Sequence, residues 1–169
     1  HLLGVAEECF PGGLSILDIG AGTGKFARSF LERCRVPVHG YTAIEPSADH
    51  VAQIRENLDG IPVEKEIILG SFTPATGFGE RFDLVLLSHC TYCFMPDPEP
   101  YLLHALDLVD ERGVAVIYHG SPTNFCSILN LVFGDILPRE RVTDPTFTSW
   151  NVRDILEKCG IPHKVTYLP

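Results

Sequence analysis

The chain has 169 residues, of which 45% are hydrophobic and 21% are charged, and its formal net charge is −9. These values suit one globular domain and exclude a disordered or fibrous chain; no apolar run approaches the roughly 20 residues that cross a bilayer. The acidic balance opposes binding to nucleic-acid phosphates and to anionic membranes, so a neutral or cationic small molecule is the easier partner.

The cysteines lack the regular spacing of a disulfide framework. They are residues 9, 34, 90, 93, 126 and 159. Several lie in apolar periodic segments, where cysteine behaves as a small hydrophobe, so we expect reduced thiols and a cytoplasmic location. The chain opens with His1 rather than methionine, and no secretory signal follows. We therefore expect a domain cut from a longer protein.

Apolar strand-like runs alternate with helical patterns along the chain, which is typical of a parallel sheet with crossover helices. Strands are predicted over residues 14–19, 38–44, about 63–69, 82–88, 113–118 and 163–168. Helices are predicted over 26–34, after an N-cap at Ser47, over a segment carrying Leu102, Leu103, Leu106 and Val109, and from Thr148 or Ser149 to Cys159. The predicted fold class is α/β and Rossmann-like: one doubly wound, mostly parallel sheet with helices on both faces, in a single domain over residues 1–169.

Two segments lie outside this alternation. Residues 1–12 lead into the first strand. Residues 121–149 form an insertion whose middle, 125–133, is predicted to be a short helix. Phe125 and Phe133 either form a lid over a substrate or belong to a simple core helix.

The segment Asp18-Ile-Gly20-Ala-Gly22-Thr-Gly24 leaves the first strand and opens the first helix. Glycines are needed where a ligand lies against bare backbone and where a sharp turn requires a positive φ. A dinucleotide fingerprint would require glycine at position 25, where this chain has lysine. The loop therefore indicates a ligand site of another kind.

Glu45 ends the second strand, at the distance from the loop where a carboxylate accepts the ribose hydroxyls of an adenosine-type cofactor. Alternatively, its charge stabilises the dipole of the following helix.

An aspartate followed by G-x-G-x-G resembles motif I of the class I S-adenosylmethionine-dependent methyltransferases, and the likeness extends over residues 14–168. More narrowly, the chain is similar to histamine N-methyltransferase and its relatives. The narrower likeness is carried by Ile44-Glu-Pro-Ser-Ala48, Phe82-Asp-Leu, His89 to Tyr92, His119-Gly-Ser121 and Thr148-Ser149. The resemblance implies S-adenosyl-L-methionine as the cofactor and a fold truncated at its C-terminal strands.

The resemblance also assigns cofactor-binding residues. The glycines line the methionine end, Glu45 holds the ribose, and a serine and a phenylalanine after the third strand meet the adenine. The full set is Asp18, Gly20, Gly22, Gly24, Glu45, His50, Ser71, Phe72 and Ser88.

His89 and Tyr92 are the candidate catalytic residues. By the resemblance, His89 occupies the position of a substrate-contacting glutamine, and Tyr92 matches an aromatic residue of the substrate pocket. An imidazole can accept a proton from the acceptor at neutral pH. Alternatively, His89 hydrogen-bonds backbone at a strand end and Tyr92 belongs to the core. The resemblance implies methyl transfer to a nitrogen of a small molecule, such as an amine or an imidazole.

Cys90-Thr-Tyr-Cys93 is a C-x-x-C segment, which raises metal and redox functions. A structural zinc site needs four ligands, and only His89 and His119 could be added. A redox motif would open a helix, whereas this one precedes Pro96. We predict no metal site and two thiols that line a pocket.

Other function classes compete with methyl transfer to a small molecule. A methyltransferase-like module that binds the cofactor without turnover is one, and a NAD-dependent oxidoreductase, disfavoured by Lys25, is another. Methylation of protein or nucleic acid is a third. The net charge and the lack of a basic stripe count against nucleic acid. The oligomeric state is not determined by the sequence.

Overall fold

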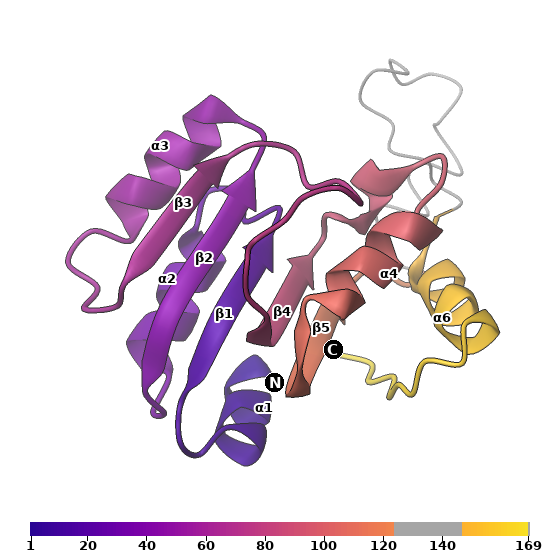
Figure 1. The fold of residues 1–169 in the computed structure, drawn as a ribbon, viewed down its shortest axis with the longest axis horizontal. Coiled ribbons are helices and arrows are strands. Elements are labelled where there is room, and N and C mark those ends of the chain that lie inside the picture. Colours follow the sequence, from indigo (N-terminus) through magenta and orange to yellow (C-terminus); the bar gives the residue numbers. More distant parts are fainter. Residues whose placement is uncertain (124–146, 169) are drawn as a thin grey trace. The chain divides into compact units, whose positions relative to one another are not determined.

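Five strands, all parallel, form one sheet in the order β3-β2-β1-β4-β5 (Figure 1). The computed structural model describes residues 1–123 and 147–168, which fall into two compact units, His1–Tyr118 and His119–Pro169. The first unit holds α1 (Leu2–Cys9), β1 (Leu14–Ile19), α2 (Lys25–Arg33), β2 (Val38–Glu45), α3 (Ala48–Asn57), β3 (Lys65–Leu69), β4 (Phe82–Ser88), η1 (Thr91–Phe94), α4 (Glu99–Asp107) and β5 (Val109–Tyr118); the second holds α6 (Ser149–Lys158). The predicted parallel α/β fold is confirmed.

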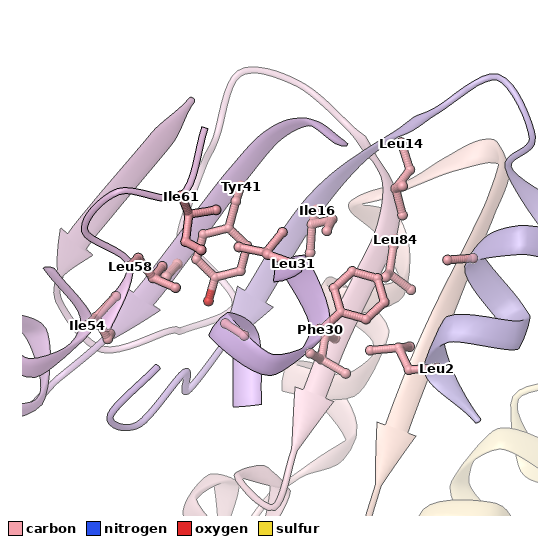
Figure 2. Close-up of a cluster of buried hydrophobic side chains, with 14 of the residues drawn as sticks. Leu2, Leu14, Ile16, Phe30, Leu31, Tyr41, Ile54, Leu58, Ile61 and Leu84 are labelled. Atoms are coloured by element: carbon pink, nitrogen blue, oxygen red, sulfur yellow. The ribbon is translucent and has the colours of Figure 1, made fainter. Parts of the chain in front are cut away.

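The central strands are buried on both faces, which is why they are apolar at consecutive positions. Ile16 of β1 and Leu84 of β4 face α1, α2 and α3 and join one apolar cluster with them (Figure 2). Leu17 of β1 and Val85 of β4 alternate with these and are fully buried toward the other face. Figure 1 shows α2 behind the sheet and α4 in front of it. The doubly wound arrangement therefore follows from the two-sided apolar pattern.

Two helices begin where capping residues predict. The Ser47 hydroxyl accepts a hydrogen bond from the backbone N–H of His50 at the start of α3. Thr148 and Asn151 form a reciprocal capping box at the start of α6. Such bonds satisfy N–H groups that the first helical turn leaves unpaired.

The predicted helix carrying Val109 is wrong at its end, because Val109 begins β5. α4 ends at Asp107, and Val109 pairs with Phe82 of β4. The pairing is irregular before Leu84 meets Val114, and a Cβ on Gly113 would lie 2.8 Å from the Asp83 carbonyl oxygen. Sheet pairing thus overrides the helical spacing of the apolar residues.

Three further expectations concern the chain ends and the insertion. A strand over 163–168 is wrong: this segment has no strand structure, and Val165, Tyr167 and Leu168 are exposed. Alternating side chains form a strand only with a neighbour to pair with. The lead-in contains α1, which buries Leu2 and Ala6. The predicted helix over 125–133, with Phe125 and Phe133, lies outside the described residues.

The strand order reverses direction at β1, whose neighbours are β2 and β4. In open α/β sheets, ligands bind beyond the carboxyl ends of the strands at such a switch point. The segments that follow β1, β2 and β4 therefore form the candidate site.

Candidate functional site

The loop from β1 to α2 makes its turn through three glycines with positive φ. The φ values are 69° at Gly20, 59° at Gly22 and 75° at Gly24. Residues with a Cβ disfavour this left-handed region, so the backbone conformation of the loop favours glycine at all three positions. A Cβ on Gly20 would lie 2.6 Å from the Cβ of Cys90, whereas a Cβ on Gly22 would meet nothing within 4 Å. Gly20 is thus packed, and Gly22 faces open space.

The loop is held by its neighbours in one conformation. The N–H of Gly20 donates to the carbonyl of Ile44 at 2.9 Å, and the N–H of Gly22 donates to Glu45 Oε2 at 2.9 Å. The Asn57 amide donates to the carbonyl of Thr23 at 2.8 Å. A ligand therefore meets a backbone surface that is already ordered, which lowers the entropic cost of binding.

Asp18, the last polar residue before the loop, is buried at the end of β1. Tyr41 of β2 donates its hydroxyl to Asp18 Oδ2 at 2.7 Å. Within the described chain, Asp18 Oδ1 is buried and has no hydrogen-bond partner. Burial raises the pKa of Asp18 to about 6; the hydrogen bond from Tyr41 lowers it, and the charge of Glu45 raises it. Ionised Asp18 is therefore costly to the folded chain.

We expect this cost in the pH dependence of stability. The folded pKa of about 6 lies above the ordinary value of 3.8, so the folded state holds the proton more tightly. The contribution of Asp18 to the free energy of unfolding is favourable below the unfolded value and falls by about 3 kcal/mol as pH rises through 6. Urea unfolding of the parent and Asp18→Asn chains between pH 4 and 7 measures it. A free-energy difference between the two chains that stays constant over this range would contradict the assignment.

Glu45 is buried, with 6% of its surface exposed. Its position at the end of β2 would suggest a more exposed side chain. Its Oε2 accepts from Gly22, and its Oε1 accepts from the N–H of Ser47 at 3.1 Å. His50 Nδ1 lies 3.2 Å from Oε1. The carboxylate thus orders both the glycine loop and the start of α3, which is part of the structural role that the sequence left open.

The two residues predicted to meet an adenine differ in exposure. Ser71 is exposed after β3. Phe72 is buried, and its ring stacks on His104 with centroids 5.3 Å apart and lies 6.0 Å from the ring of Phe94. Most of the Phe72 ring is therefore used in packing against α4 and η1.

His89 follows β4 and is the one non-glycine residue with a positive φ, 53°, among the described residues. Its N–H donates to the carbonyl of Tyr118 at 2.9 Å, and its side chain is exposed. The ring makes no hydrogen bond to any described residue, so the backbone-bonded alternative does not describe it. A bulky residue in the left-handed region is strained, and such strain is frequent at functional sites. Ser88 and Tyr92, on either side, are half-buried.

The thiols of the C-x-x-C segment differ in burial. Cys90 is buried beneath Gly20, and Cys93 is exposed. Burial raises the pKa of the Cys90 thiol, and partial desolvation of its sulfur together with the charge of Glu45 raises the pKa of Cys93, so both thiols are poor nucleophiles. In the described ranges, no group of three or more metal-ligating side chains is placed to hold an ion. Cys90 thus supports the loop by packing.

The sequence draws attention to the glycine loop and Glu45, but not to Tyr41, Asn57 and Cys90 as the residues that support them. Each lies in an ordinary helix, strand or turn pattern, and only the register of β1 against β2 brings Tyr41 to Asp18.

A cavity of about 350 Å³ lies elsewhere, between α3 and the start of β3. It shares no lining residue with the glycine loop.

A family model described as a methyltransferase domain matches residues 16–113, which is more than half of the chain. The search of curated protein sequences found no match to this chain. The matched residues include most of β1 and all of the glycine loop, β2 and β4. No helix in the described segments is both long and apolar enough to cross a membrane.

Solved structures share the fold at low sequence identity. An S-adenosylmethionine-dependent methyltransferase from Clostridium acetobutylicum aligns with a TM-score of 0.61 at 13% identity, over 78% of this chain and 51% of its own. The plantazolicin methyltransferase BpumL, solved with a triazolic desmethylPZN analog and SAH, aligns with a TM-score of 0.66 at 14% identity, over 94% of this chain and 60% of its own. The cyclase SpnF aligns with a TM-score of 0.52 at 19% identity, over 64% of this chain and 40% of its own. The chain thus spans about half the length of these proteins.

Proposed function

The chain belongs to the methyltransferase domain family, and from this premise we propose that it transfers the methyl group of S-adenosylmethionine to a nitrogen atom of a small molecule. The observation that carries the proposal is the ordered glycine loop at the switch point of the sheet, with Gly22 facing open space and Glu45 beside it. A shared fold does not determine the reaction, because SpnF has this fold and is a cyclase.

The residues around the loop fit a nucleoside cofactor with an amino-acid end. Bare backbone at Gly22 leaves room for a ligand. An ionised carboxylate has about four acceptor positions, and Glu45 uses three, for Gly22, Ser47 and His50. One position therefore remains for a ribose hydroxyl. The unpartnered Asp18 Oδ1 offers a further acceptor next to the loop.

S-adenosylmethionine, when bound, supplies an activated methyl group on a sulfonium. The residues of the chain then have to align the acceptor with that methyl and exclude water. His89 is suited to aligning the acceptor, because it follows β4 at the switch point and its ring is exposed and not hydrogen-bonded within the described chain. It can orient an acceptor nitrogen or take a proton from it. Tyr92, half-buried in η1, forms part of the wall around the acceptor.

The acceptor class follows from the resemblance to the histamine N-methyltransferase group. We propose a small aromatic or imidazole amine that His89 reaches by a hydrogen bond. BpumL, which shares the fold, was solved with a triazolic desmethylPZN analog, so the fold alone does not determine the acceptor. The net charge of −9 favours a neutral or cationic acceptor over a polyanion.

Methyl incorporation tests the proposal directly. The chain is incubated with isotopically labelled S-adenosylmethionine and a panel of aromatic amines, imidazole amines, peptides and RNA. We expect label in the small amines alone. Label in RNA or peptide would contradict the acceptor class. Tight S-adenosylhomocysteine binding without label in any acceptor would instead support a binding module without turnover.

Glu45→Gln is expected to weaken S-adenosylhomocysteine binding by roughly 1.5–3 kcal/mol, the scale of hydrogen bonds to a charged acceptor. An amide places a donor where either Gly22 or Ser47 now donates, so the free energy of unfolding also falls by about 1–3 kcal/mol. Calorimetric titration and urea unfolding separate the two effects.

Asp83→Asn is the matched control for Glu45→Gln. Asp83 Oδ2 accepts the N–H of Ser15 at 2.7 Å, near the amino ends of β1 and β4 and thus at the opposite end of the sheet. We expect it to lose stability and keep affinity. If both variants lose stability and neither loses affinity, Glu45 has only a structural role.

A further inference from the structure

A buried tyrosine holds the aspartate at the start of the glycine loop. Tyr41 is 2% exposed, and Figure 2 shows its ring among the apolar side chains of the cluster, near Ile61. Its hydroxyl donates to Asp18 Oδ2 at 2.7 Å. The second oxygen, Oδ1, is buried without a partner in the described part of the chain. A buried acceptor without a donor is unfavourable, so this atom has an unmet hydrogen bond.

We propose that Tyr41 is a positioning residue of the ligand site, which fixes the Asp18 carboxyl through Oδ2 and leaves Oδ1 to accept a hydrogen bond from the bound ligand. This inference rests on the proposed function. A neutral Asp18 carboxyl carries one proton and is a weaker hydrogen-bond acceptor than the ionised carboxylate. On binding, the carboxyl O–H bond therefore breaks and its proton goes to solvent. The carboxylate keeps the hydrogen bond from Tyr41 at Oδ2, and an N–H or O–H of the ligand donates to Oδ1.

Burial and two side chains, Tyr41 and Glu45, set the pH at which the Asp18 carboxyl ionises, and a third titratable side chain, Cys90, is coupled to that carboxyl. Tyr41 and Glu45 come from β2, and Cys90 follows β4. The Tyr41 hydroxyl lowers the pKa of Asp18, while burial and Glu45 raise it to about 6. Burial keeps the Cys90 thiol neutral by raising its pKa. His50 contacts Glu45, not Asp18, and the Asp18→Asn variant shows which part of the pH profile does not arise from the Asp18 carboxyl.

The test measures S-adenosylhomocysteine affinity by calorimetry from pH 5 to 8, together with the carboxyl titration of Asp18 by carbon NMR in the ligand-free chain. For the parent chain we expect affinity to rise about tenfold over this range as the carboxyl ionises. Tyr41→Phe removes the hydrogen bond that favours the ionised form, so Asp18 titrates at higher pH. Affinity is then about threefold weaker at pH 6.5 and near the parent value at pH 8.

Two further variants control the test. Tyr101→Phe removes a hydroxyl of α4 that has no hydrogen bond to Asp18, and should keep the parent profile. Asp18→Asn carries no titrating group, so the rise in affinity near pH 6 should disappear. If Tyr41→Phe fails to fold, Asp18→Asn still tests the inference, because a pH profile that it leaves intact would contradict the role of the Asp18 carboxyl.

Two results would overturn the inference. One is an Asp18 titration that does not move in Tyr41→Phe, or an affinity lowered equally at every pH, as a merely structural tyrosine would give. The other is a pH profile that Asp18→Asn leaves intact. A folded parent chain that binds no S-adenosylhomocysteine at any pH contradicts the proposed function instead, and the NMR titration still decides whether Tyr41 controls Asp18.

Discussion

Gly20→Ala is expected to lower the free energy of unfolding by roughly 2–5 kcal/mol, the sum of left-handed backbone strain and core overpacking. The new methyl group would lie 2.6 Å from the Cβ of Cys90, which is itself buried and cannot move aside freely. The φ of 69° adds strain for any residue with a Cβ. Urea unfolding of the variant measures the loss.

Gly22→Ala is the matched control, because its φ of 59° is similar but its Cβ meets nothing within 4 Å. We expect a stability loss of about 1–2 kcal/mol from backbone strain alone. The methyl group occupies the open space where a ligand would lie, so affinity for S-adenosylhomocysteine should fall at least about tenfold. Equal stability losses at the two positions would contradict the packing assigned to Gly20, and parent affinity in Gly22→Ala would place the ligand elsewhere.

His89→Ala is expected to reduce methyl transfer by about 100-fold, the usual scale for losing a general acid–base group, with little change in S-adenosylhomocysteine affinity. His89→Gln should retain more activity than His89→Ala if the role is hydrogen bonding to the acceptor. If the role is proton transfer, the glutamine should do no better than alanine. Turnover with the acceptor identified from the amine panel separates the two roles.

His39→Ala controls for the loss of an exposed imidazole, because His39 lies near the start of β2, away from the carboxyl ends of the strands. It should keep full turnover. His89→Gly is a second test: it relieves the strain of the φ of 53°, so it should not lower stability, and it should reduce turnover about as much as His89→Ala does. Undiminished turnover in His89→Ala would remove this residue from the mechanism.

The sheet could be predicted from sequence because its strands have local signals. Apolar runs on both faces locate β1 and β4, and Ser47 and Thr148 locate the starts of α3 and α6. The errors arise where pairing decides. Val109 continues the helical spacing of apolar residues, yet it belongs to β5 because it pairs with β4. Residues 163–168 alternate like a strand but have no neighbouring strand with which they pair.

The part of the candidate site that could be predicted from the sequence is the backbone conformation of the glycine loop. Positive φ at Gly20, Gly22 and Gly24 is a local requirement that the spacing of the glycines reveals. What supports the loop is not local. Tyr41 reaches Asp18 only through the register of two strands, and the burial of Glu45 depends on the loop folding back over it. Such contacts leave no pattern in a single sequence.

Calorimetric titration of the parent chain with S-adenosylhomocysteine beside NAD tests the central claim most directly, because both ligands carry an adenosine and only one matches the glycine spacing. We expect S-adenosylhomocysteine to bind in the micromolar range, at roughly −7 to −9 kcal/mol, and NAD to give no comparable heat. Binding of NAD with no binding of S-adenosylhomocysteine would contradict the assignment of the loop and the function built on it.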